Sequence, residues 1–221
     1  PEAVAAVEDA ARLLESLGHK VEQASPKMDM LAMSMDWLSM WFANCAASVD
    51  WVREETGCGN DGFELDTLAM AAFGHATSAP DYVRGYQRWQ GYSRALAEFH
   101  QQYDLWLTPT LALQPARIGA SETPAWQQRM LKVILKVGAE KLVMKTGLVE
   151  QMVKENLKYV PFTQLANVTG VPAMSVPLHW CESGLPLGVQ LVSAPFAEET
   201  LFQVGHAYEQ ATDWHAREPG V

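Results

Sequence analysis

The chain has 221 residues, of which 48% are hydrophobic and 19% are charged. This composition excludes a disordered chain and is sufficient for one large domain or two small ones. The formal net charge is −10, so the surface repels phosphate backbones and we expect no nucleic-acid partner. The three cysteines, Cys45, Cys58 and Cys181, lie far apart. They predict neither a disulfide framework nor a zinc site, and they favour a reducing, cytoplasmic location.

The N-terminal segment has the pattern of a helix, a turn and a strand. Apolar residues recur at helical spacing over residues 2–17, at Val4, Val7, Ala11, Leu14 and Leu17. Gly18 stands where a helix C-cap is expected, and residues 19–23 predict a short strand. Such a unit is typical of α/β proteins.

Residues 26–56 predict a long helix that is rich in methionine and tryptophan. Ser25 and Pro26 have the residue types of an N-cap and a first helical position, and Gly57 is expected to end the helix. Its methionines suit two structures, the pliable wall of an apolar pocket or a buried core. These methionines are Met28, Met30, Met33, Met35 and Met40.

A loop at residues 57–62 matches the G-x-G-x-x-G pattern of dinucleotide-binding proteins. We exclude that function because the fingerprint requires a strand before the loop, and here a helix precedes it. Glu54 and Glu55 at the end of that helix would also repel a pyrophosphate.

Two helices and a strand are predicted next. The helices cover residues 64–75 and 80–102, the second capped by Ser78, and the strand covers residues 103–108. Arg84, Arg88 and Arg94 lie largely off the apolar face of the second helix. We therefore expect them to be solvated rather than to bind an anion. Residues 111–125 predict a loop.

Residues 126–158 predict a basic amphipathic helix carrying six of the lysines. Its expected apolar face consists of Leu131, Ile134, Leu135, Leu142, Val149 and Met152. Such a helix can lie on a membrane, or pack on its own domain with lysine stems covering apolar surface. Glu140, Glu150 and Glu155 interrupt the positive face, so packing on the domain is favoured and we expect no membrane partner. The chain has no apolar run of about 18 residues that would span a bilayer.

Two apolar runs, residues 172–178 and 187–193, predict an antiparallel pair of strands buried on both faces. A helix over residues 198–212 follows. We expect four strands and about seven helices, without a linker between independent domains. Ser175 and His179 are predicted to pack in the first of these strands and not to form a catalytic dyad.

The stretch from Pro161 to Trp214 resembles the closing segment of amidase-signature enzymes. The matching motifs occur in family order as Asn167–Pro172, Gly184–Gln190, Pro195–Phe196 and Glu199–Leu201. Residues 103–110 resemble the family's preceding strand, and residues 3–26 resemble the helix and strand after its catalytic core. Within the family, PAMSVPLHW and SAPDYVRGY are most similar to the 6-aminohexanoate cyclic-dimer hydrolase branch.

The resemblance implies an α/β fold with a mixed β-sheet flanked by helices. It also implies amide hydrolysis by a Ser-Ser-Lys triad, in which a neutral lysine accepts the serine proton and loop N–H groups stabilise the oxyanion. The sequence contains no Gly-Gly-Ser-Ser-Gly-like run and no G-x-S-x-G elbow. We therefore expect residues 1–221 to be a partial amidase-signature domain without catalytic residues, metal or cofactor. Its expected partners are an amide substrate and the missing N-terminal half, with a homodimer as a further possibility.

The expected substrate-binding residues lie on the long helix. The run Ala43–Ser48 consists of small side chains between the bulky Trp41 and Trp51, which leaves space for an acyl chain. We predict that Asn44, Cys45 and Trp41 contact the substrate. For Cys45 a buried, inert thiol is the alternative.

Two other functions fit the resemblance. The chain can belong to the A-type component of an aminoacyl-tRNA amidotransferase, which would require partner subunits. Alternatively, it can be a non-catalytic scaffold that keeps half of the amidase fold. A stable complex on co-purification would favour the former, and a well-behaved monomer the latter.

Overall fold

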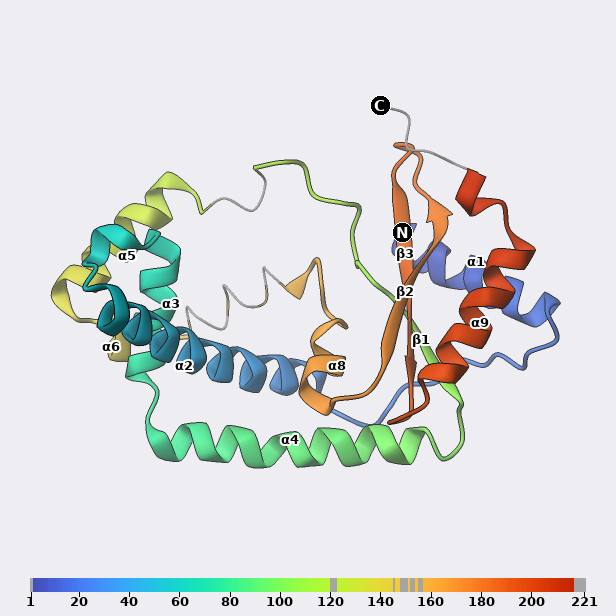
Figure 1. Ribbon diagram of the computed structural model, residues 1–221, viewed down its shortest axis with the longest axis horizontal. Coiled ribbons are helices and arrows are strands. Elements are labelled where there is room, and N and C mark those ends of the chain that lie inside the picture. The colour runs from blue at the N-terminus through green and yellow to red at the C-terminus, as the bar shows by residue number, and fades with distance from the viewer. Residues whose placement is uncertain are drawn as a thin grey trace. The chain divides into compact units, whose positions relative to one another are not determined.

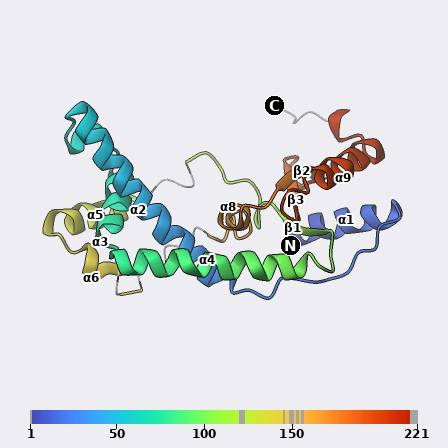
Figure 2. The ribbon, with the colours of Figure 1, turned by 60° about the horizontal axis from the view of Figure 1, so that its bottom comes forward.

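The computed structural model describes residues 2–119, 123–144, 146–147, 151, 154 and 157–216 (Figure 1). The chain divides into two compact units. Unit 1 comprises Pro1–Met30, Gln90–Ala116 and Asn156–Val221, and unit 2 comprises Leu31–Trp89 and Arg117–Glu155. The continuous helix α4 (Ala79–Phe99) begins in unit 2 and ends in unit 1 (Figure 2).

Unit 1 is built on a three-stranded antiparallel sheet in the order β1-β3-β2. The strands are β1 (Leu105–Pro109), β2 (Ala173–Trp180) and β3 (Pro186–Ser193). The predicted pair of apolar strands is confirmed as β2 and β3. The expectation of burial on both faces holds best for the central strand β3, because β2 has only one partner strand and remains partly exposed.

Two helices cover one face of this sheet, α1 (Glu2–Ser16) and α9 (Glu198–Ala211). The predicted apolar face of this segment is correct at Leu14 and in part at Val7, which packs at the edge of the core, but wrong at Val4 and Leu17, which are exposed. Alanines make most of the inward face instead. These are Ala3, Ala6 and Ala10. Alanine at these positions lets the helix backbone approach β3 closely, which larger valines would prevent.

The opposite face of the sheet carries aromatic contacts. The ring of Trp106 in β1 lies 6.1 Å from that of Phe99 at the end of α4 and 6.0 Å from that of Phe162. Phe162 precedes the short helix α8 (Gln164–Thr169), which was not predicted from the sequence. Gly170 ends α8 with a positive φ.

The predicted strand at residues 19–23 is wrong, since this segment lies outside the sheet. Only Val21 is partly buried, against the cluster that contains Leu14 and Tyr208. The segment is held by this apolar contact and by a hydrogen bond of 2.7 Å from the Tyr103 hydroxyl to Oε1 of Glu22, and it forms no ladder with a strand. The strand predicted over 103–108 is confirmed as β1, shifted by one to two residues.

Unit 2 is helical in its described residues and contains α2 (Met30–Thr56), α3 (Leu65–Ala76), α5 (Ala125–Val137), α6 (Glu140–Met144) and the first part of α4. Helix α2 begins four residues later than predicted and ends before Gly57 as predicted. Helices α2 and α3 cross at Gly74, where an added Cβ would lie 2.1 Å from the carbonyl oxygen of Phe42 and 2.8 Å from Cβ of Ala46. The absence of a side chain at Gly74 is therefore needed for this crossing.

The basic helix predicted over 126–158 is interrupted at Gly138, which caps α5 in the left-handed conformation. Leu131 and Ile134 are buried as predicted, but Leu142 is 67% exposed, contrary to prediction. Val149 and Met152 lie outside the described residues.

Candidate functional site

The three residues predicted to bind substrate share one side of α2 in unit 2. Trp41, Asn44 and Cys45 are spaced by three and four positions, so they are neighbours on the helix surface. Trp41 is 45% exposed, and its ring stacks on that of Trp37 with centroids 5.6 Å apart. This stack gives α2 a broad, flat apolar surface beside two small side chains.

Asn44 and Cys45 differ in the contacts they make. The Nδ2 of exposed Asn44 donates a hydrogen bond to the carbonyl oxygen of Met40, 2.8 Å away on the same helix. Cys45 is half-buried, and its Sγ donates to the carbonyl oxygen of Thr67 at 3.8 Å. Desolvation by burial raises the pKa of the Cys45 thiol. Cys45 therefore stays protonated at neutral pH, and a protonated thiol is a poor nucleophile.

The methionines of α2 serve mainly as core residues. Met33 and Met40 are buried, at 0% and 7% exposure, which supports the core interpretation for these two. Met30 and Met35 are half-buried. Met40 also contributes to a pocket on the neighbouring side of the helix.

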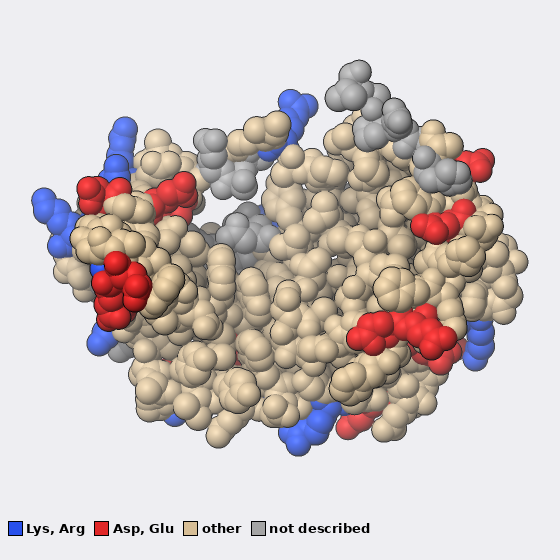
Figure 3. Space-filling view, in the orientation of Figure 1, with Lys and Arg blue, Asp and Glu red and all other residues tan. Residues whose placement is uncertain are grey.

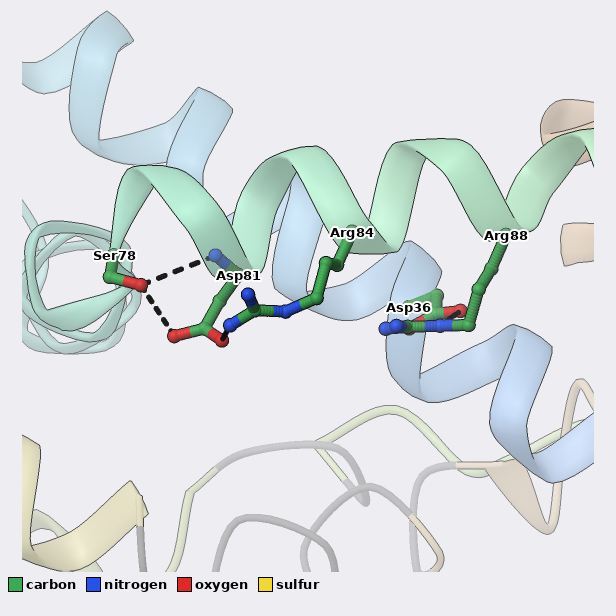
Figure 4. Close-up of polar contacts among 5 residues, drawn as sticks. All are labelled: Asp36, Ser78, Asp81, Arg84 and Arg88. Carbon is green, nitrogen blue, oxygen red and sulfur yellow. Dashed lines mark hydrogen bonds and ion pairs between the residues drawn. The ribbon is translucent and has the colours of Figure 1, made fainter.

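This pocket, of about 490 Å³, lies between α2, the start of α4 and α6, all in unit 2. Its polar lining includes Asp36, Ser78, Asp81, Arg84 and Arg88 (Figure 4). Trp41, Asn44 and Cys45 do not line it. The charged pocket and the predicted substrate face are thus two separate features of the same helix.

A bidentate ion pair fixes one wall of the pocket. The guanidinium of Arg88 donates from Nε to Oδ2 of Asp36 at 2.7 Å, and from Nη2 to Oδ1. Asp36 is buried at 7% exposure, while the side chain of Arg88 is half exposed. Arg88 was expected to be solvated, but it ties α4 to α2. No local sequence pattern indicates this contact, because the partners are 52 positions apart.

Ser78 and Asp81 look like a serine–carboxylate pair, but they form a helix cap. The Oγ of Ser78 accepts a hydrogen bond from the backbone N–H of Asp81 at 3.2 Å and donates one to its Oδ2 at 2.5 Å. The Ser78 hydroxyl, followed by the guanidinium of Arg84, lowers the pKa of Asp81. An ionised carboxylate with a lowered pKa is a weak base, so Ser78 is not activated for attack.

Ser175 and His179 also have separate partners. Ser175 Oγ lies 2.7 Å from Thr110 Oγ1, whereas His179 Nδ1 lies 3.0 Å from Asp9 Oδ2. An irregularity in the β2–β3 register between Pro177 and His179 turns His179 towards α1. This geometry agrees with the prediction that the two residues do not form a dyad.

The glycine-rich loop at 57–62 follows α2 and contains a 3-10 turn, Asn60–Gly62. Arg53 of α2 donates to Oδ1 of Asn60 at 2.6 Å, so the loop is held back against its own helix. Within the described residues, no cluster of histidine, cysteine and carboxylate side chains is arranged to hold a metal ion. No described helix is both long and apolar enough to cross a bilayer.

The sequence profile of the amidase family matches residues 1–202 of the chain. The chain belongs to the amidase family. This confirms the resemblance to amidase-signature enzymes and the fold class that it implied.

Comparison with individual members of the family shows how much of their length the chain covers. The amidase AmiC of Mycobacterium leprae (strain TN) is 31% identical over 206 residues, which are 92% of this chain and 39% of AmiC. The structure of 6-aminohexanoate cyclic dimer hydrolase complexed with substrate superposes with a TM-score of 0.80 and 26% identity, over 99% of this chain and 43% of the hydrolase. The A-type component of the glutamyl-tRNA(Gln) amidotransferase of Gloeothece citriformis (strain PCC 7424) is 55% identical over 53 residues, which are 24% of this chain and 11% of that component. The chain thus spans less than half the length of these relatives.

Proposed function

We propose that this chain is the C-terminal part of an amidase that hydrolyses a linear or cyclic carboxamide through a serine acyl-enzyme. The observation that carries the proposal is the superposition on 6-aminohexanoate cyclic dimer hydrolase along 99% of the chain. A similar cyclic amide is therefore the first substrate to try. In this proposal the nucleophile, the second serine and the lysine lie in a segment outside the 221 residues, and the chain alone is inactive.

The chain's own contribution is the wall of the acyl pocket on α2. We assign Trp41 and Asn44 to contacts with the substrate. Cys45 is assigned to limiting the width of the acyl pocket. The exposed face of Trp41, stacked on Trp37, suits an apolar chain. The raised pKa of Cys45 suits a residue that shapes the pocket without reacting.

Labelling with a fluorophosphonate, which modifies activated serines, tests the placement of the nucleophile. Intact-mass measurement of the chain should find no adduct, and the longer protein that contains it should gain one. Two of the described serines support this outcome, since Ser78 caps a helix and Ser175 is hydrogen-bonded to Thr110. One stoichiometric adduct on the chain alone would show that this half carries its own activated serine.

The Cys45→Leu substitution in the longer protein tests the substrate face. Leucine adds bulk where α2 approaches Thr67, so kcat/KM should fall for large cyclic amides by about tenfold more than for small linear ones. Ser48→Ala, in the same small-residue run, is the control. If Cys45→Leu and the parent protein had identical kinetics on every amide tested, Cys45 would not contact the substrate.

The A-type component of an amidotransferase is the second candidate, favoured by the 55% identity to such a protein over 53 residues. That match covers only 24% of this chain, whereas the matches to AmiC and to the hydrolase cover nearly all of it. Co-purification of the longer protein with stoichiometric partner subunits would favour the amidotransferase.

A further inference from the structure

Helix α5 presents a stripe of apolar side chains to solvent. Trp126, Val133 and Val137 are 63%, 59% and 66% exposed, and half-buried Met130 lies between them. The spacing of four, three and four residues places all four side chains along one line of the helix. Exposed single apolar residues are ordinary, but four in one line form a surface that is suited to burial.

The stripe is not the packing face of an undocked helix. Leu131 and Ile134 are buried at 4% and 8% exposure on an adjacent side of α5, where the helix packs in unit 2 with α3. Because α5 already buries this face, the stripe is a second apolar surface with a fixed orientation.

Cations flank the stripe on its solvent side. Arg129, Lys132 and Lys136 are exposed, and residues 125–137 include no acidic residue although the whole chain has a net charge of −10. This acid-free combination ends with α5, since α6 begins with Glu140. In the space-filling view, blue side chains project from the end of unit 2 that carries α5 and α6, alongside red groups (Figure 3).

We propose that α5 binds the surface of anionic lipid bilayers. A narrow apolar stripe with a tryptophan, bordered by a row of lysines and arginine, is the arrangement of helices that lie in a membrane interface. Cations close to an anionic surface strengthen such binding by electrostatic attraction, which salt screens. Lysine stems can also keep the ammonium groups among the headgroups while the stripe enters the acyl boundary. The sequence-based expectation of no membrane partner rested on Glu140, Glu150 and Glu155, none of which belongs to α5: Glu140 begins α6, and the other two lie outside the described residues.

Vesicle flotation with the 221-residue chain tests this proposal. The chain should float with vesicles of phosphatidylcholine containing 30% phosphatidylglycerol, remain at the bottom with pure phosphatidylcholine, and lose binding as salt is raised. Without vesicles it stays at the bottom whether it is monomeric or associated. The double substitutions Val133→Ser/Val137→Ser and Lys132→Glu/Lys136→Glu should each lower the apparent partition coefficient by at least about tenfold. Phe202→Ser, at an exposed apolar position in unit 1, is the matched control and should leave it unchanged.

The possible outcomes separate a bilayer from other occupants of the stripe. No flotation with anionic vesicles, or flotation that neither double substitution lowers, would overturn the proposal. If Val133→Ser/Val137→Ser instead converts an associated chain to a monomer in light scattering and leaves flotation unchanged, the stripe binds a second copy of the chain. Circular dichroism of each variant verifies that the helices are retained.

Discussion

Phe196 combines two unfavourable features at one residue. It has a φ of 63°, which costs a residue with a bulky side chain about 1–2 kcal/mol, and its side chain is 95% exposed. Nothing within the described residues thus offsets the strain through burial of the ring. Such strained backbone conformations persist only where the surrounding structure holds them in place. This fits the proposal that the rest of an amidase domain packs here.

Phe196→Gly should stabilise the isolated chain for this reason. Glycine adopts a positive φ without strain, and removing an exposed ring forfeits little burial, so the free energy of unfolding should rise by about 1 kcal/mol. Urea denaturation monitored by circular dichroism measures the change. Phe196→Ala is the control because it removes the ring but keeps the strain, and it should change the stability by less than about 0.5 kcal/mol. A gain shared equally by both variants would show that the ring, and not the backbone, is unfavourable.

At the scale of single elements, local patterns predicted what depends on neighbours in the sequence. Apolar runs predicted β2 and β3, and Gly18 and Gly57 marked the ends of α1 and α2 because both take a positive φ. The inward face of α1 was predicted only in part, since hydrophobicity favours valine whereas close packing on the sheet selects alanine. Residues 19–23 were assigned to a strand from local pattern alone, which does not reveal whether a partner strand is present.

The pocket in unit 2 also could not be predicted from local sequence patterns. Asp36 and Arg88 meet across 52 positions, and each taken alone has the pattern of a polar residue on an amphipathic helix. The predicted substrate residues were chosen by side-chain size on α2, which identifies a contiguous face but cannot locate a cavity formed with α4 and α6. Motifs in the C-terminal segment were sufficient to identify the family. The contacts between charged residues in unit 2 could be found only from the structure.

At the scale of the whole molecule, the sheet of unit 1 has two outer strands in the described residues, β1 and β2. Outer strands present unpaired backbone groups that pair readily with another chain. The relatives are more than twice as long as the part that this chain matches. In the proposed function, the remainder of the domain would cover surfaces that the chain alone leaves to solvent.

We therefore expect the isolated chain to associate. Size-exclusion chromatography with light scattering should give a mass that grows with concentration, and thermal unfolding should be broad because two units with incomplete surfaces do not melt as one. The longer protein, measured in parallel, should elute at a fixed mass and melt cooperatively. A sharp monomer peak with a cooperative transition from the chain alone would contradict the assignment as a partial domain. It would favour the scaffold protein instead, because a chain that satisfies its own sheet edges does not need a missing half.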